Sequence, residues 1–113
     1  MLAKANRVRQ GADYKAIVRR GTRFVSPNTV TYVRNNPGVD GVRFGFIVSK
    51  SVGIAVRRNR VRRRLKAACF ELIPLVKPGS DVVVRALPAS ANVRWVTLLE
   101  EISRALSKGN PTS

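Results

Sequence analysis

The segment that reads V-R-R-N-R-V-R-R-R-L-K-A-A, from Val56 to Ala68, has the most distinctive chemistry of this sequence. Seven of the ten residues from Arg57 to Lys66 are cationic and six of these are arginine, and no acidic residue lies between Asp40 and Glu71. The planar guanidinium of arginine can grip phosphate oxygens in two places and can stack on exposed bases. Such a segment is typical of a surface that binds a phosphate-bearing polymer.

The spacing of this segment predicts a helix with one apolar side and one cationic side. On a helical wheel the apolar residues gather on one side: Val61, Leu65, Ala68, Cys69 and Leu72. Asn59, Arg62, Arg63 and Lys66 gather opposite them, and Arg57, Arg60 and Arg64 flank the apolar stripe. The Asn59 amide could bond a base edge or hold its neighbouring arginines in place, and the sequence leaves both alternatives open.

The charge of the whole chain points to a polyanionic partner. Its 113 residues include 22 Lys and Arg, 6 Asp and Glu and no His, which gives a formal net charge of +16. Nucleic acid is the first candidate for such a partner. A merely solvated basic face would mix in glutamate at i to i+4 spacing, which this segment lacks. A membrane-surface helix would carry bulkier apolar residues than Ala68 and Cys69.

Catalytic machinery is not apparent in the sequence. It has no His, no cluster with metal-ligand spacing and no Gly-rich phosphate loop, and Ser49 and Lys50 form a weak pair without a third group. We therefore expect a partner to carry any chemistry. The lone Cys69 excludes an internal disulfide, and no segment reaches the ~20 apolar residues of a membrane helix, so we expect a cytoplasmic protein without a membrane partner.

Periodicity and turn residues predict the elements that position the arginine segment. We expect a helix over 13–20 capped by Asp13, one kinked strand or two short strands over 23–34, and a hairpin loop over 35–41. A strand over 42–49, the arginine helix from after Gly53 to about Ile73, and a strand over 81–87 covered on both faces should follow. The last helix should bury the stripe that contains Trp95, Leu98, Leu99, Ile102 and Leu106.

This order predicts an α+β fold, an α-β sandwich of a small mixed sheet with helices. We expect a single domain over residues 1–108 and a disordered tail over residues 109–113.

The stretch F-I-V-S-K-S-V-G-I-A-V-R-R-N-R-V-R-R-R-L-K-A, from Phe46 to Ala67, resembles the signature of the protein subunit of bacterial ribonuclease P. In that family a strand ending in V-S-K leads through a Gly turn into a helix that carries an R-N-R box. The likeness extends upstream to N-R-V-R-Q-G-A-D-Y-K-A-I-V-R-R-G and downstream through D-V-V-V-R-A to the last helix. It therefore covers nearly the whole chain.

The resemblance implies a small basic partner of a catalytic RNA, ribonuclease P RNA, which removes the 5′ leader of precursor tRNA. The RNA would carry this endonucleolytic reaction and bind most of the Mg²⁺, and no further protein partner would be required. The resemblance also implies a left-handed β-α-β crossover around the arginine helix, whereas the general handedness rule favours a right-handed one.

The resemblance further implies two sets of binding residues. The contacts to the RNA subunit would come from Arg57, Arg58, Asn59, Arg60, Arg62, Arg63 and Lys66. The contacts to the leader would come from Tyr14, Val18, Tyr32, Ser49 and Lys50. Val18 stands where many relatives have an aromatic residue and Ser51 where a second lysine is usual, so we expect less stacking and one charge fewer in the leader site.

Two other function classes compete with this interpretation. A ribosomal or ribosome-assembly protein would have the same basic helix but no need for a leader site. A nuclease that acts without an RNA subunit is hard to reconcile with the lack of acid and His clusters. Replacing Tyr14 or Tyr32 by Ala separates the ribonuclease P interpretation from the ribosomal one, because only a leader site discriminates precursor from mature tRNA.

Overall fold

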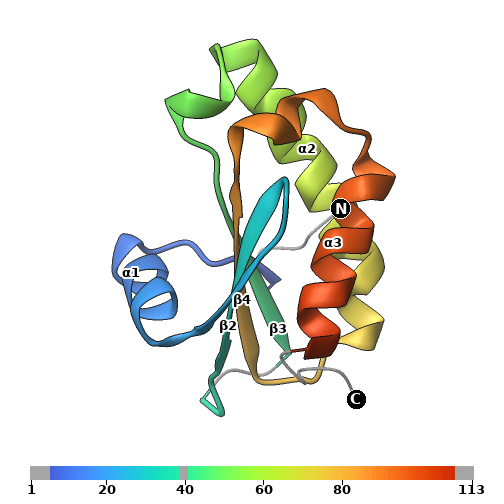
Figure 1. The fold of residues 1–113 in the computed structure, drawn as a ribbon. Helices are drawn as coiled ribbons and strands as arrows, with labels where there is room; N and C mark the ends of the chain where they lie inside the picture. The colour runs from blue at the N-terminus through green and yellow to red at the C-terminus, as the bar shows by residue number, and fades with distance from the viewer. Residues whose placement is uncertain (1–5, 39–40, 109–113) are drawn as a thin grey trace.

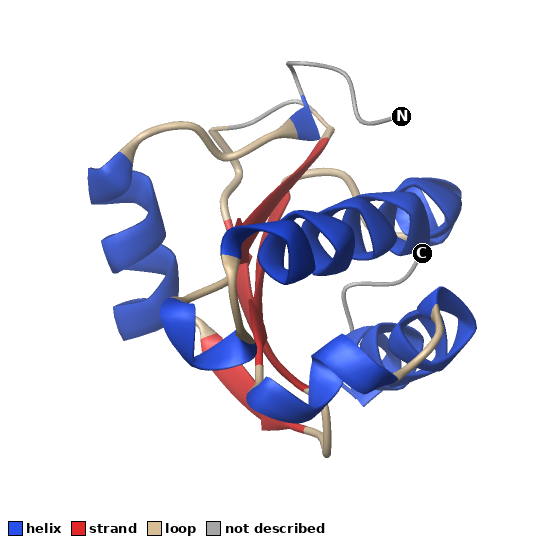
Figure 2. Cartoon of the chain, turned by 90° about the horizontal axis from the view of Figure 1, so that it is seen from above, coloured by secondary structure: helices blue, strands red, loops and turns tan. Residues whose placement is uncertain are grey.

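A four-stranded mixed sheet forms the middle layer of the computed structural model, which describes residues 6–38 and 41–108 (Figure 1). The strands are β1 (Thr22–Val25), β2 (Thr29–Asn35), β3 (Val42–Ile47) and β4 (Ser80–Ala86), in the order β1-β2-β4-β3. Helix α1 (Gly11–Arg20) covers one face, and helices α2 (Ala55–Leu72) and α3 (Trp95–Lys108) cover the other (Figure 2). The predicted α-β sandwich with a mixed sheet is confirmed.

The arginine helix α2 connects two parallel neighbours, β3 and β4, while the pairs β1–β2 and β2–β4 are antiparallel. The expected hairpin over residues 35–41 is wrong, because β4 lies between β2 and β3. The chain does reverse its direction between β2 and β3, but a local sequence pattern cannot reveal that a later strand separates the two. Residues 39 and 40 of this loop lie outside the described part, as does the tail expected over 109–113.

Strand β4 supplies side chains to both apolar layers of the molecule. Val82 and Val84 pack toward α2 and α3 with Phe44, whereas Val83 packs toward α1 with Ile17. All three valines are fully buried. The continuous apolar run of this strand therefore indicated burial on both faces, as expected.

Helix α2 runs as predicted, and Ile73–Leu75 continue it as a 3-10 turn that contains Pro74. Helix α1 begins two residues before Asp13, and its N-cap is Gln10 without a side-chain cap bond, so the predicted Asp13 cap is wrong. Asp13 lies in the first turn and pairs with Arg43 instead. Gly21 ends α1 as expected.

Helix α3 buries Leu98, Ile102 and Leu106 as predicted, but Trp95 is 43 % exposed. Trp95 is the first residue of α3, and the α2 side chains beside it are Ala67 and arginines. Periodicity gives the direction of a side chain around the helix axis and not the chemistry of the neighbouring element, so the expected burial of Trp95 is wrong. Among the described residues, no helix combines the length and the apolarity that spanning a bilayer requires.

Candidate nucleic-acid interface

The buried side of α2 fixes which of its side chains face outward. Val61, Leu65, Ala68, Cys69 and Leu72 are all buried, as the helical wheel predicts. Burial also raises the pKa of the Cys69 thiol, so this sulfur stays protonated and has no nucleophilic role at neutral pH. The core side of α2 thus serves as an anchor for the cations on its other sides.

The seven residues predicted to contact RNA all lie at least partly in solvent. Arg57, Asn59, Arg60 and Arg63 are exposed, and Arg58, Arg62 and Lys66 are partly buried. Within residues 6–38 and 41–108, ion pairs join only Asp13 and Asp81 to Arg34 and Arg43. No cation of α2 is therefore neutralised by an acidic residue of the described chain.

Asn59 holds a neighbouring arginine in the structure. This is one of the two roles that the sequence left open for its amide. Its Oδ1 atom accepts a hydrogen bond from Nη1 of Arg62 at 3.0 Å. Val56, Asn59, Arg62, Arg63 and Lys66 line a shallow hollow of about 430 Å³, here called the Asn59 hollow. The amide thus restricts one guanidinium where the cationic surface of α2 is concave.

A second cavity joins α2 to α1. It measures about 310 Å³ and takes Arg62 and Lys66 from α2 and Tyr14 from α1. The remaining lining residues are Arg7, Val8, Arg9, Phe44 and Phe46. We call it the β3-edge cavity. Sequence reasoning missed Arg7 and Arg9, because their relation to α2 depends on how the segment before α1 runs along β3.

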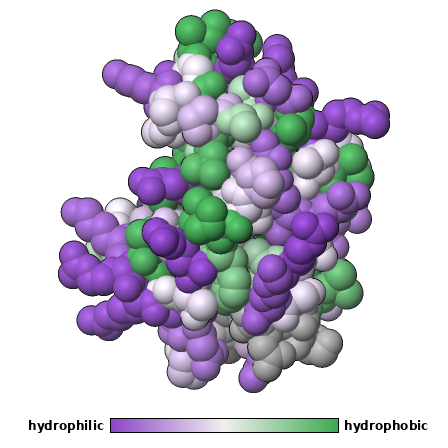
Figure 3. Space-filling view, viewed as in Figure 1, coloured by the Kyte–Doolittle hydropathy of each residue, from purple (hydrophilic) through white to green (hydrophobic). Residues whose placement is uncertain are grey.

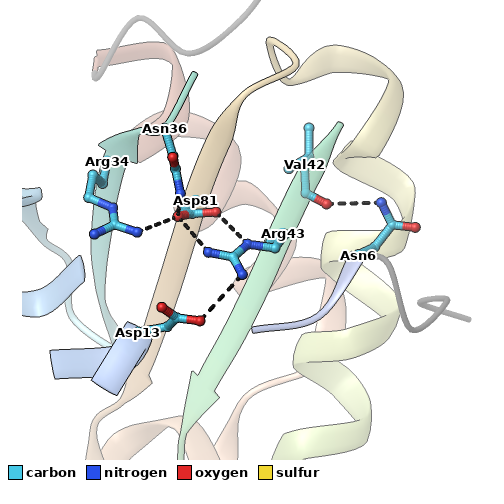
Figure 4. Close-up of polar contacts among 7 residues, drawn as sticks. All are labelled: Asn6, Asp13, Arg34, Asn36, Val42, Arg43 and Asp81. Atoms are coloured by element: carbon cyan, nitrogen blue, oxygen red, sulfur yellow. Dashed lines mark hydrogen bonds and ion pairs between the residues drawn. The ribbon is translucent and has the colours of Figure 1, made fainter. Parts of the chain in front are cut away.

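Three side-chain and backbone groups cover the free edge of β3 beside this cavity. Asn6 Nδ2 donates to the carbonyl oxygen of Val42 at 2.9 Å (Figure 4), and the Val8 N–H donates to that of Phe44 at 2.8 Å. The Phe46 N–H donates to the Tyr14 hydroxyl oxygen at 3.1 Å. Backbone groups of an edge strand are thereby satisfied, and the Tyr14 ring is fixed over the sheet.

A groove on the other side of Tyr14 lies between α1 and the end of β3. Tyr14, Lys15, Val18, Arg19 and Ile47 line its volume of about 450 Å³, and we call it the α1 groove. Figure 3 shows hydrophilic side chains projecting from the α1 side of the molecule. An apolar floor with one tyrosine and two cations suits a single-stranded nucleic acid, whose bases stack while its phosphates attract cations.

The structure brings together part of the predicted leader set. Tyr14 and Val18 share the α1 groove, and Tyr32 packs in the same apolar cluster but is only 5 % exposed. Ser49 and Lys50 are exposed beyond the end of β3, where Ser49 Oγ and Ser51 Oγ are hydrogen-bonded at 2.8 Å. Lys15 and Arg19 were missed, although their spacing of four residues on a helix signals a shared face.

A buried carboxylate ties α1 to the sheet on this face. Asp81 lies on β4, and its side chain accepts hydrogen bonds from Arg34, Asn36 and Arg43 on or next to the flanking strands (Figure 4). Burial alone would raise the pKa of Asp81, but these hydrogen bonds outweigh it and lower the pKa to about 2. Arg43 also reaches Asp13 of α1 at 3.4 Å, so the network holds the helix that carries Tyr14.

The sequence is similar to those of known proteins. Residues 2–110 match the family model described as Ribonuclease P. The chain is 48 % identical over 108 residues to the ribonuclease P protein component of Clavibacter michiganensis subsp. michiganensis, with 96 % of each chain covered. It is 46 % identical to that of Pseudarthrobacter chlorophenolicus, over 94 % of this chain and 78 % of that protein.

The fold is also similar to solved structures. The RNase P protein of Staphylococcus aureus aligns with a TM-score of 0.83 and 25 % identity, over 97 % of this chain and 100 % of that chain. The RNase P protein of Thermotoga maritima aligns with a TM-score of 0.79 and 25 % identity, over 90 % of this chain and 96 % of that chain.

Proposed function

This chain belongs to the ribonuclease P protein family, and we propose that it binds ribonuclease P RNA and the 5′ leader of precursor tRNA during removal of that leader. One observation carries the proposal. The β3-edge cavity places Arg62 and Lys66 of α2 and Tyr14 of α1 around one space. The cationic side of α2 and the aromatic side of α1, which we propose as two RNA-binding surfaces of different chemistry, are therefore adjacent. A protein that only coated folded RNA would need the first surface alone.

The cationic side of α2 is the proposed surface for the RNA subunit. Its proposed contacts are Arg57, Arg58, Asn59, Arg60, Arg62, Arg63 and Lys66. Unpaired guanidinium groups on a rigid helix contact the phosphates of a folded RNA by charge and shape rather than by base sequence. Because such contacts release counterions, affinity for the RNA subunit should fall steeply as salt rises.

The α1 groove is the proposed surface for the leader. A base could stack on Tyr14, whose ring is fixed by its hydrogen bond, while Lys15 and Arg19 attract the leader backbone. Val18 offers apolar contact without aromatic stacking. Tyr32 is too buried to stack in this arrangement and supports the groove from within the sheet, whereas the exposed Ser49 and Lys50 extend the surface beyond β3.

Magnesium in the proposed reaction is held mainly by the RNA subunit. In the described ranges no three His, Cys, Asp or Glu side chains are grouped so that they could hold a metal ion. When bound to the RNA, magnesium would activate the attacking water and stabilise charge on the scissile phosphate. The contribution of this chain is to position and neutralise RNA phosphates, in the cytoplasm, without a further protein partner.

Cleavage of precursor tRNA at low magnesium tests the proposal. A bacterial ribonuclease P RNA is assayed with and without this protein, and the 5′ ends of the products are mapped. Because the cations of α2 replace part of the ionic screening, the protein should restore cleavage at the mature 5′ end. If cleavage is not restored and the protein binds ribosomal RNA tightly instead, a ribosomal role replaces the proposed one.

A further inference from the structure

Trp95 is not among the proposed contacts, although it forms one wall of a hollow beside α2. Together with Arg60, Arg63, Arg64 and Ala67 of α2, it lines a volume of about 300 Å³, here called the Trp95 hollow. Trp95 is 43 % exposed, although a tryptophan usually hides most of its apolar surface. It is also the only tryptophan of the chain. A large aromatic ring is thus open to solvent beside three guanidinium groups.

The hollow is built by contacts that set the spacing of its walls. Arg64 is partly buried, and its Nη1 atom donates a hydrogen bond to the carbonyl oxygen of Val93 at 2.8 Å. Val93 precedes α3 by two residues, so this bond ties α2 to the start of α3 where Trp95 lies. Ala67 leaves room between the two helices, because its side chain is a single methyl group. Arg60 and Arg63 stay exposed at the rim.

The chemistry of the hollow fits one nucleotide. An indole ring gives a base a stacking surface that does not depend on its identity, and guanidinium groups bind the phosphate and stack in turn. No acidic residue lines the hollow, so nothing in it repels an anion. An apolar peptide side chain would gain nothing from three cations. The lining therefore favours an anionic ligand that carries an aromatic ring.

The position of the hollow identifies which RNA supplies the nucleotide. Arg63 lines both the Trp95 hollow and the Asn59 hollow, so the new site continues the cationic surface of α2. The α1 groove, in contrast, involves only residues of α1 and β3, on the other face of the sheet. A leader bound in that groove would lie away from Trp95. The RNA subunit, in contrast, is proposed to bind the cationic surface of α2. Arg63 belongs both to that surface and to the Trp95 hollow.

We propose that the Trp95 hollow binds a single unpaired nucleotide of the ribonuclease P RNA, with its base stacked on the indole and its phosphate held by Arg60 and Arg63. This assignment rests on the proposed function and adds a stacking contact to a surface otherwise described only by charge. It also explains why the first residue of α3 is a solvent-exposed aromatic.

The intrinsic fluorescence of the unmodified protein tests this stacking contact directly, because Trp95 is its only source of tryptophan emission. The protein is titrated with a transcript of a bacterial ribonuclease P RNA and, separately, with precursor tRNA alone. Stacking on a base should quench the emission on binding the RNA subunit. Unchanged emission at saturating RNA subunit, or quenching by precursor tRNA alone, would overturn the assignment.

Affinity measurements with variants complete the test. Loss of one stacked base should weaken binding of Trp95→Ala to the RNA subunit by roughly 5- to 150-fold, and Trp95→Phe should restore most of the loss. Phe70→Ala removes a different exposed aromatic, which lies on α2 outside the hollow, and should bind like the unmodified protein. Thermal melting checks that each variant is folded.

The outcomes separate this inference from the function on which it rests. If the unmodified protein restores precursor cleavage and Trp95→Ala binds the RNA subunit equally well, the nucleotide site is wrong and the proposed function stands. If the unmodified protein neither binds the RNA subunit nor restores cleavage, both are wrong.

Discussion

The hydroxyl oxygen of Tyr14 accepts a hydrogen bond from the backbone N–H of Phe46 at 3.1 Å, which joins α1 to the free edge of β3. The bond holds the tyrosine ring directly over Gly45, between the α1 groove and the β3-edge cavity. A tyrosine that is fixed before RNA arrives loses little further entropy when a base stacks on it. The arrangement of the proposed leader site therefore depends on a glycine in the neighbouring strand.

Gly45→Ala should displace Tyr14. A Cβ atom at residue 45 would lie 2.6 Å from Cε1 and 2.8 Å from Cζ of Tyr14, which is too close for van der Waals contact. We expect about 1–3 kcal/mol of destabilisation in urea unfolding and a weaker affinity of the holoenzyme for precursor tRNA, but not for mature tRNA. Gly11→Ala is the control, because nothing lies within 4 Å of a Cβ there. Equal effects of both substitutions would contradict the role of Gly45.

Asp81 should titrate far below a free aspartate. Its pKa is lowered from 3.8 to about 2, so its hydrogen bonds stabilise the fold fully above about pH 4 and lose this effect as pH falls toward 2. The contribution amounts to about 2 kcal/mol, at 1.36 kcal/mol for each pKa unit. The carboxyl carbon shift of Asp81, followed by NMR from pH 6 downward, measures it. A midpoint near 4 would show that the arginines do not hold the carboxylate.

The buried carboxylate of Glu101 should matter for stability and its neighbour Glu100 should not. Glu101 on α3 accepts hydrogen bonds from the Asn28 backbone N–H at 3.2 Å and the Thr29 hydroxyl at 2.8 Å, and a further one from the Asn28 side-chain amide. In Glu101→Gln one of the two acceptor oxygens becomes an NH₂ group that faces at least one of these donors, so we expect about 1–3 kcal/mol of destabilisation. The exposed Glu100→Gln should unfold like the unmodified protein. Matching denaturation midpoints for the two variants would refute this prediction.

Lys66→Ala should change how RNA binding depends on salt. Lys66 lines both the Asn59 hollow and the β3-edge cavity, and no acidic residue of the described chain pairs with it. Loss of one phosphate contact should reduce the slope of log affinity against log salt by about 0.7–0.9 for the RNA subunit. Arg104→Ala removes an exposed cation from α3 instead and should leave the slope unchanged. If Lys66→Ala has the same slope as the unmodified protein, the ammonium group of Lys66 lies outside the interface.

Local patterns in the sequence sufficed where one element alone determines the structure. The periodicity of α2 predicted every buried residue of its core side, from Val61 to Leu72. Pro74 predicted where the regular helix ends. The three consecutive valines of β4 predicted burial on both faces, because successive side chains of a strand point to opposite faces of the sheet. The cations of α2 were predicted as candidates because a helix that buries one side must present the others to solvent.

Features that depend on the pairing of distant elements were not predictable in this way. Asp13 was expected to cap its own helix, but Arg43, thirty residues later in the sequence, attracts its carboxylate. Trp95 was expected in the core, and only the packing of α3 beside the arginines of α2 shows why it is exposed. Arg7 and Arg9 joined the candidate site because the segment that contains them runs along the edge of β3.

The most direct test of the two-surface arrangement is the affinity of the reconstituted holoenzyme for precursor tRNA relative to mature tRNA. The double variant Lys15→Ala/Arg19→Ala removes both cations of the α1 groove, and Arg104→Ala/Lys108→Ala removes the same charge from exposed positions of α3. We predict that the first variant lowers the precursor-to-mature affinity ratio several-fold while the second leaves it unchanged. Parallel losses for both tRNAs in the first variant, with no change in the ratio, would contradict the leader site in the α1 groove.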